Sequence, residues 1–168
     1  MLVAAGLTAC ATAPVPAPPG QERLVGRLLL QVQGQPQRSF GADFELAGSE
    51  RSGELLLSGP LGSTAARASW GPQGAQMRTA DGQVHAAQDL QALATQAFGE
   101  AIPMAALFDW LRARPWPAAA WQPRPDGQAG FEQLGWLVSL TRQSEGWIEA
   151  QRVTPAPIVT VRVRLLAD

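Results

Sequence analysis

The side chains best suited to acid–base or metal chemistry are few in this 168-residue chain and lie far apart in its sequence. The single histidine, His85, has apolar neighbours, whereas a zinc site needs three or four histidine, cysteine or carboxylate ligands. The carboxylates Asp43 and Glu45 are two residues apart in an alternating segment, so both belong to its polar, solvated face. No glycine-rich phosphate loop and no serine-centred nucleophile motif occurs in the sequence. We therefore expect no enzyme activity, no metal and no cofactor.

The single cysteine, Cys10, is placed for covalent attachment of lipid. It follows a run of apolar and small residues, 1–9, which is typical of the end of a secretory signal peptide. Such a run is too short to cross a bilayer, which needs about 20 residues. The tetrad Leu7-Thr8-Ala9-Cys10 resembles the lipobox of bacterial lipoproteins, in which the cysteine thiol is acylated and the preceding segment is removed. We expect residues 1–9 to be a signal-peptide remnant and Cys10 to be the lipidation site.

The segment after Cys10 has the composition of a linker. Residues 11–20 (ATAPVPAPPG) contain four prolines and no charge, as expected of an extended, semi-rigid tether. Ala11, rather than aspartate, follows the cysteine, and by resemblance to the sorting rule of bacterial lipoproteins this favours the outer membrane. We expect residues 10–22 to be a lipidated N-terminus and linker that anchors the protein at the outer membrane, facing the periplasm.

Length and composition indicate a single domain after the linker. The chain is 46% hydrophobic, enough for one sizeable core, and we expect the domain to span residues 23–168. Because there is one cysteine, no intramolecular disulfide can form and the fold depends on its apolar core. The net charge is −1, and the thirteen basic residues, all arginine, are scattered along the chain. We therefore expect no nucleic-acid partner.

Most of this domain alternates apolar and polar residues with a period of two, which predicts β-strands with one buried face. The alternation covers residues 27–33, 39–46, 54–59, 65–70, 131–142, 147–153 and 158–166. Short strands separated by turns rich in glycine and proline favour an antiparallel meander over alternating strands and helices. Periodicity alone leaves open whether the sheet forms a sandwich or curls into a barrel covered by helices.

Between the two groups of strands the period changes to 3.6, which predicts helices. Residues 88–98 place their apolar side chains on one stripe, with Asp89 as the N-cap and Gly99 as the stop. A second helix is predicted over residues 103–113, with Pro103 at its first position.

The order of these features resembles the outer-membrane lipoprotein receptor family LolB. The run GELLLSGPLGST at 53–64 is one matching segment, and its part PLGST at 60–64 is among the most specific elements. The other is the spacing from Ile102-Pro103-Met104 through Leu107 and Asp109-Trp110-Leu111 to Arg114-Pro115. Together with the lipobox, these elements extend over nearly the whole chain.

This resemblance implies a mainly β fold with helices (α+β): an incomplete antiparallel β-barrel with helices covering an apolar cavity. It also implies a function, in which the protein receives acylated lipoproteins from the soluble periplasmic carrier LolA. The cargo is then inserted into the inner leaflet of the outer membrane without nucleotide. We expect the protein to act as a monomer.

The buried strand faces and the second helix supply the residues that we expect to line the cavity. For a carrier, a cavity lining is an under-filled core, so assignment to the core and to the lining are compatible. We expect Trp116, Trp121 and Trp147 to belong to the core as well. The predicted lining comprises Leu28, Leu30, Phe40, Phe44, Leu46, Leu55, Leu57, Trp70, Met104, Leu107, Trp110, Leu111, Trp136 and Val138.

The turn Pro60-Leu61-Gly62 is unusual because an apolar side chain occupies its tip, where polar residues are common. From the residues alone, Leu61 either folds back onto the sheet or projects into solvent. The family resemblance favours the second alternative, a membrane-insertion loop in which Leu61 contacts the lipid surface.

Two other functions are compatible with these features. One is a structural lipoprotein whose β-domain docks a partner in an outer-membrane assembly complex, and the other is a lipocalin-like carrier of a free lipid. The state of the interior separates them, because a receptor needs an apolar void for acyl chains, whereas a docking module is filled and has an apolar patch outside.

Overall fold

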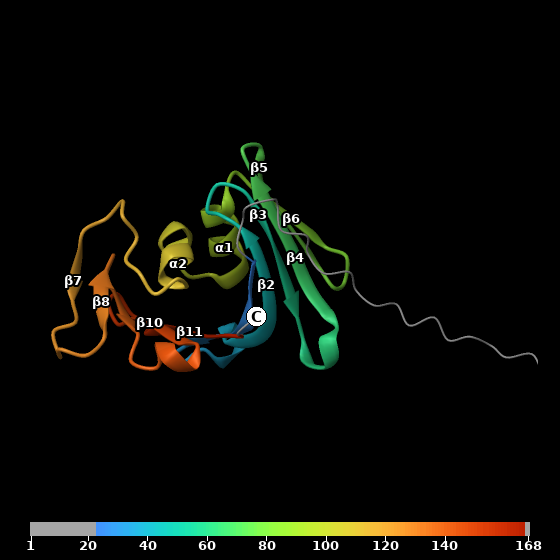
Figure 1. Cartoon of the computed structure of the whole chain (residues 1–168). Helices are drawn as coiled ribbons and strands as arrows, with labels where there is room; N and C mark the ends of the chain where they lie inside the picture. Colours follow the sequence, from blue (N-terminus) through green and yellow to red (C-terminus); the bar gives the residue numbers. More distant parts are fainter. Residues whose placement is uncertain (1–22, 167–168) are drawn as a thin grey trace, which may run out of the picture.

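The computed structural model describes residues 23–166, and their strands form a single antiparallel sheet (Figure 1). The strand order is β6-β5-β4-β3-β2-β1-β11-β10-β9-β8-β7, so the first and last strands are neighbours in the middle of the sheet. The strands are β1 (Arg23–Val32), β2 (Phe40–Gly48), β3 (Gly53–Ser58), β4 (Thr64–Gly71), β5 (Gly74–Thr79), β6 (Val84–Ala87), β7 (Trp121–Pro123), β8 (Gly130–Gln133), β9 (Trp136–Ser139), β10 (Trp147–Arg152) and β11 (Val159–Leu165).

The sheet curves around two helices, α1 (Leu90–Phe98) and α2 (Met104–Trp110), which lie on its concave side (Figure 1). Its edge strands, β6 and β7, are not paired with each other, so the sheet is open rather than closed. Short 3-10 turns connect strands at Pro36–Arg38, Pro60–Gly62 and Gln143–Glu145. The expected mainly β, antiparallel architecture with covering helices is confirmed in this coarse form.

Register explains how the sheet acquires one apolar face. In the pairing of β1 with β2, Leu28 lies opposite Ala42 and Leu30 opposite Phe40, and these side chains point toward the helices. The alternate pair, Arg27 and Asp43, lies on the outer face, where the two side chains form an exposed ion pair of 3.6 Å. The period-two alternation is thus the direct consequence of burying one face.

Helix α1 is bounded by the residues that the sequence predicted. The Asp89 carboxylate accepts a hydrogen bond of 2.7 Å from the backbone N–H of Ala92, which satisfies one free donor of the first turn. Gly99 ends the helix in the left-handed conformation, with φ of 65°, and its N–H bonds to the Thr95 carbonyl.

Helix α2 is shorter than predicted, because it ends at Trp110 rather than at residue 113. Ala113 has φ of 57°, which is incompatible with a right-handed helix, and Pro103 serves as the N-cap instead of the first helical residue. Among residues 23–166, neither helix is long and apolar enough to cross a membrane.

The predicted strand over 131–142 is wrong in extent, because it is a hairpin of two strands, β8 and β9. The chain reverses at Leu134 and Gly135, which have φ of 54° and 77°. Two successive positive φ values match the twist of a tight hairpin, but leucine in the first of these positions is an uncommon turn signal. Strand β5 and the short edge strands β6 and β7 were also absent from the sequence prediction.

Candidate functional site

A small pocket lies between the concave face of the sheet and the two helices. Its volume is about 90 Å³, and all of the residues around it are apolar. Strands β1 to β4 and β11 provide one wall, while the helices and the connection between them provide the other. The lining consists of Leu28, Leu30, Phe40, Phe44, Leu46, Leu55, Trp70, Leu90, Phe98, Ile102, Met104, Leu107, Phe108, Leu111, Val161 and Val163.

Aromatic pairs join the two walls of this pocket. Phe40 of β2 stacks on Phe98 of α1, with ring centroids 5.3 Å apart. Trp70 of β4 meets Phe108 of α2 edge to face at 6.0 Å. Such pairs contribute about 0.5–1.5 kcal/mol each beyond the area that they bury, so they hold the helices against the sheet.

The structure brings most of the predicted lining residues to this pocket and places four elsewhere. Leu57 lines a smaller adjoining pocket of about 30 Å³, between β3, β4 and α1. Trp110, Trp136 and Val138 are buried in the core but do not line this pocket. The ten that surround the pocket are Leu28, Leu30, Phe40, Phe44, Leu46, Leu55, Trp70, Met104, Leu107 and Leu111.

Sequence reasoning missed six residues of the lining, although signals for most of them were present. Leu90, Phe98 and Phe108 belong to the apolar stripes of the predicted helices, and Val161 and Val163 to the alternating last strand. Ile102 lies in the connection between the helices, where no periodicity marks a buried side chain.

Trp110 anchors the packed region beside the pocket. Its ring is completely buried and contacts Phe131 and Trp136, with centroids 6.5 and 6.1 Å away. Its indole N–H donates a hydrogen bond of 2.9 Å to the side-chain oxygen of Gln133.

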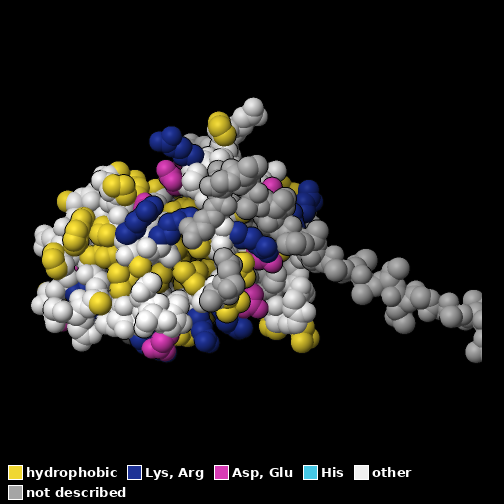
Figure 2. All heavy atoms as spheres, in the orientation of Figure 1, with side chains coloured by type: hydrophobic (Ala, Val, Ile, Leu, Met, Phe, Trp, Pro, Cys, Tyr) yellow, Lys and Arg dark blue, Asp and Glu magenta, His cyan; other side chains and the backbone are white. Residues whose placement is uncertain are grey.

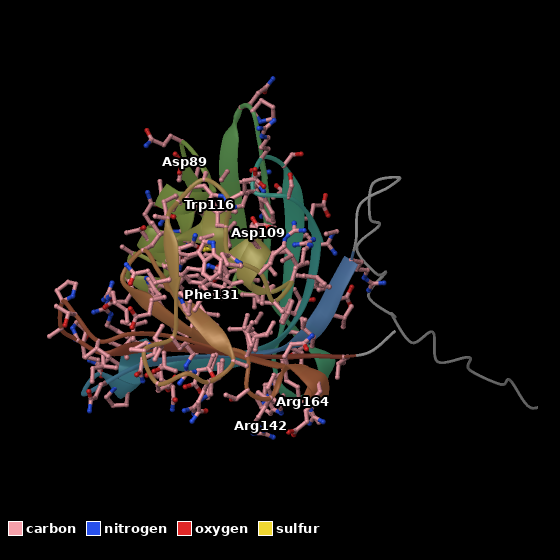
Figure 3. All side chains as sticks on the ribbon, turned by 60° about the vertical axis from the view of Figure 1, so that its left-hand side comes forward. Asp89, Asp109, Trp116, Phe131, Arg142 and Arg164 are labelled. Atoms are coloured by element: carbon pink, nitrogen blue, oxygen red, sulfur yellow. The ribbon has the colours of Figure 1, made fainter. Side chains whose placement is uncertain are left out.

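The Gln133 amide, also buried, organises the chain that follows α2. Its oxygen accepts a second hydrogen bond of 2.9 Å from the backbone N–H of Trp116, and its nitrogen donates to the carbonyls of Trp116 and Ala119. Every donor and acceptor of this amide is therefore used, as a buried polar group requires. Figure 3 shows Trp116 and Phe131 on the helix-facing side of the sheet, where this network lies.

The turn between β3 and β4 exposes Leu61 completely, with a relative exposure of 105%. Its conformation is left-handed, with φ of 67°, and Gly62 follows with φ of 75°. The turn is closed by a hydrogen bond of 2.8 Å from the N–H of Gly59 to the Ser63 carbonyl. The alternative in which Leu61 folds back onto the sheet is therefore wrong. In Figure 2 the hydrophobic tip at the lower right coincides with this turn in Figure 1.

A second group of apolar side chains lies on the outer surface, at the end of the sheet formed by β7, β8 and β9. Trp121, Leu134 and Val153 are each about half exposed around an open groove of about 540 Å³. The expectation that Trp121 belongs to the core is thus wrong, because β7 is an edge strand and all three of its residues are exposed. Figure 2 shows hydrophobic side chains gathered over this part of the molecule.

The titratable groups of residues 23–166 include no cluster that could hold a metal ion. His85 is exposed on β6, and no three histidine, cysteine or acidic side chains of this region gather at one point. The resolved pKa changes belong to surface pairs: the hydrogen bond from Arg142 lowers the pKa of Glu145, and that from Arg124 lowers the pKa of Asp126. Figure 3 places Arg142 and Arg164 at the lower edge of the molecule, away from the helices and the pocket.

Comparison with known proteins identifies the family. The sequence model of the family described as Outer membrane lipoprotein LolB matches residues 23–168. A protein of Bordetella petrii named outer-membrane lipoprotein LolB is 36% identical over 76% of this chain and 67% of its own length. The protein of the same name from Bordetella pertussis is 33% identical over 96% of this chain and 87% of its own length. That of Chromobacterium violaceum is 29% identical over 71% and 63%. The chain therefore belongs to the LolB family of outer-membrane lipoproteins.

Proposed function

We propose that this protein is a lipoprotein receptor anchored in the outer membrane through Cys10, with residues 10–22 as its tether and 23–168 as its binding domain. It takes acylated lipoproteins from the periplasmic carrier LolA and inserts them into the inner leaflet of the outer membrane. The observation that carries the proposal is the pocket between the sheet and the helices, around which no polar residue lies.

The apolar lining gives the acceptance step its driving force. Each methylene group removed from water contributes about 0.8 kcal/mol, so acyl chains have a strong preference for such a site. Transfer from carrier to receptor needs only a difference in fit, because about 1.4 kcal/mol shifts the ratio of the two complexes tenfold. No nucleotide and no reacting side chain is required for this step.

Leu61 provides the contact for delivery. A fully exposed leucine at the tip of a closed turn can enter hydrocarbon without any other rearrangement of the domain. Burial of its side chain contributes roughly 1.5–3 kcal/mol, which favours brief rather than permanent contact with the bilayer. Brief contact suits a receptor that must return to accept further cargo.

A two-stage transfer assay tests this function. The full chain is mixed with LolA loaded with an acylated lipoprotein, and liposomes are then added to the separated complex. We expect cargo to move first to the chain and then to the liposomes. Cargo that remains on LolA in the first stage would contradict the proposed receptor function.

The anchor is tested by replacing Cys10 with alanine. Cys10 lies outside the described residues, and no other segment of the proposed tether is apolar enough to replace an acylated residue. We expect the Cys10→Ala chain to lose all palmitate label in cells and to move from the membrane to the soluble fraction. Label that persists on the variant would place the lipid elsewhere.

The outer groove, whose lining mixes apolar and polar residues, favours a second candidate, a structural lipoprotein that docks a partner. Exposed Trp121, Leu134 and Val153 are typical of a contact surface, and the inner pocket is small. A docking module would accept no cargo from LolA in the first stage of the assay. A lipocalin-like carrier would bind free fatty acid but would likewise leave the acylated protein on LolA.

A further inference from the structure

The inner pocket is too small for the cargo that the proposed function assigns to it. A water-sized group needs roughly 10–15 Å³, so 90 Å³ holds about six to nine such groups. A palmitoyl chain has about sixteen carbons and therefore does not fit in the pocket with its walls in this position. Because the sheet is a continuous hydrogen-bonded wall, the wall that moves to admit the chain must be the helical one.

The two helices and their connection form one unit. The Gln91 side chain of α1 donates to the carbonyl of Ile102, at 2.9 Å, and accepts from the N–H of Met104, at 3.0 Å. These bonds tie the first helix to the start of the second. Any outward movement of the pocket wall therefore carries α1, the connection and the first turn of α2 together.

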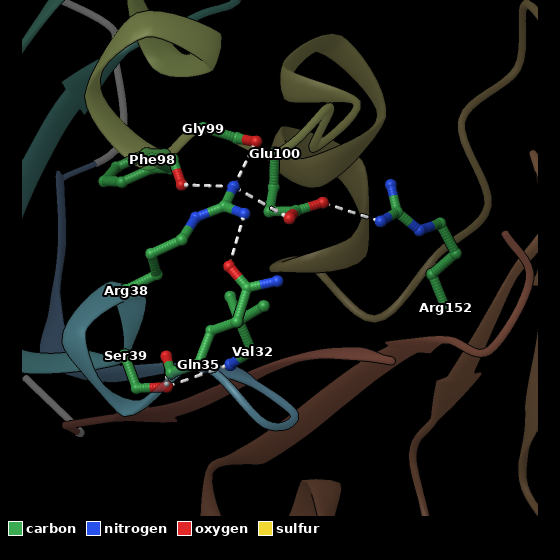
Figure 4. Close-up of polar contacts among 8 residues, drawn as sticks. All are labelled: Val32, Gln35, Arg38, Ser39, Phe98, Gly99, Glu100 and Arg152. Atoms are coloured by element: carbon green, nitrogen blue, oxygen red, sulfur yellow. Dashed lines mark hydrogen bonds and ion pairs between the residues drawn. The ribbon is translucent and has the colours of Figure 1, made fainter. Parts of the chain in front are cut away.

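Within residues 23–166, two groups of polar contacts fasten this unit to the sheet, at opposite ends. At the end of α2, Trp110 bonds to Gln133 within the fully satisfied buried network described above. At the connection between the helices, the Glu100 carboxylate is held between two arginines (Figure 4). The first group is neutral and packed among aromatic rings, whereas the second is ionic.

Glu100 is only 6% exposed, yet each of its oxygens has a cationic partner. Its Oε1 lies 2.8 Å from Nη2 of Arg38, which belongs to the turn between β1 and β2. Its Oε2 lies 2.6 Å from Nη2 of Arg152, at the end of β10. The carboxylate thus fastens the helical connection to two separate parts of the sheet.

The arginines reinforce this attachment from both sides. Arg38 also donates to the carbonyls of Phe98 and Gly99, so it satisfies free acceptors at the end of α1. Arg152 lies over the ring of Trp136, with its guanidinium carbon 5.7 Å from the centroid. Phe98 itself lines the pocket, so these contacts hold a pocket wall in place.

We propose that Glu100, with Arg38 and Arg152, is a releasable clasp that keeps the pocket closed and must open to admit an acyl chain. This inference rests on the proposed function, since it concerns how the same pocket takes its ligand. The helical unit swings outward about the Trp110–Gln133 attachment when the clasp opens.

The chemistry of the two attachments explains why the Glu100 attachment opens and the Trp110–Gln133 attachment does not. Burying the charges of Glu100 and Arg152, with Arg38 partly buried beside them, carries a desolvation cost that offsets much of their attraction. Water repays that cost when the three groups separate. In the closed state, Nε of Arg152 is buried and has no acceptor among residues 23–166, a cost that opening also removes. Separating Trp110 from Gln133 would instead expose a large aromatic surface and break the hydrogen bonds of the buried Gln133 amide.

Uptake of a fluorescent palmitate tests the clasp. The full chain carrying Cys10→Ala is mixed rapidly with the probe, alone and with Glu100→Gln, which keeps the shape and removes the charge. We expect uptake about tenfold faster with Glu100→Gln, and similarly faster with Arg152→Gln, without further gain when both are combined. Glu149→Gln is the matched control, because it removes the carboxylate partner of Arg162 on the outer face. We expect it to leave the rate unchanged.

Hydrogen exchange of the ligand-free chain supplies a second readout. We expect backbone amides of residues 98–104 to exchange about tenfold faster in Glu100→Gln, with amides of β1 and β11 unchanged. A merely structural ion cluster would lower the melting temperature while leaving probe uptake and this local exchange unaltered, and that result would overturn the clasp. If the rates change as expected but no cargo is accepted from LolA, the proposed function fails and the clasp stands.

Discussion

Delivery of cargo to liposomes is expected to fall about 100-fold when Leu61 is replaced by glutamate, while acceptance from LolA stays unchanged. The substitution removes roughly 1.5–3 kcal/mol of hydrocarbon contact and adds a charge that resists entry into the bilayer. The effect is confined to the second stage because Leu61 is fully exposed and takes no part in the pocket lining. The measurement is the rate of each stage of the transfer assay, taken separately.

The chain offers a closely matched control in Leu134. It too is an exposed leucine in a tight turn, with φ of 54° against 67° for Leu61, so Leu134→Glu introduces the same side chain into similar backbone. We expect Leu134→Glu to deliver cargo at the normal rate. Equal losses from both substitutions would mean that added charge alone slows delivery, and the insertion role of Leu61 would be rejected.

Replacing Trp110 with alanine is expected to cost about 3–5 kcal/mol of unfolding free energy, among the largest effects open to a single substitution here. The side chain has no exposed surface, contacts Phe131 and Trp136, and donates to Gln133. Alanine leaves a large cavity and removes one of the two donors to the Gln133 oxygen. Urea unfolding followed by circular dichroism measures the change.

Two companion variants separate packing from hydrogen bonding. Trp110→Phe keeps an aromatic ring but removes the indole N–H, and we expect it to cost about 1–3 kcal/mol. Trp121→Ala removes a ring that also meets Phe131 edge to face but is 52% exposed, and we expect a cost below about 1.5 kcal/mol. A Trp110→Ala chain within about 1 kcal/mol of wild type would show that α2 is not anchored at this point.

The sequence by itself determined those features whose physical cause lies within a few residues. Alternation identified the strands that make the long central pairings, because a sheet with one buried face must alternate. Asp89 and Gly99 marked the ends of α1, because a capping carboxylate and a left-handed glycine act on their own turn. Ten lining residues followed from these faces once a pocket was assumed.

The tertiary structure decided the features that depend on distant parts of the chain. Leu134 and Leu61 both occupy left-handed turns that no glycine signal marked at their own positions, and only packing of the surrounding strands places them there. The tryptophans divided between a buried Trp110 and an exposed Trp121 according to whether another element covers them.

Pocket volume and the Glu100 clasp are likewise tertiary properties. The pocket volume is the small space left where two large surfaces, the sheet and the helices, pack against each other. No local sequence pattern encodes it. Arg152 and Glu100 are 52 residues apart in the chain. The two arginines reach one carboxylate only because the fold brings the turn between β1 and β2 close to the end of β10 (Figure 4). Sequence determines which faces are apolar, but contacts between charges so far apart in the chain exist only once the sheet has curved around the helices.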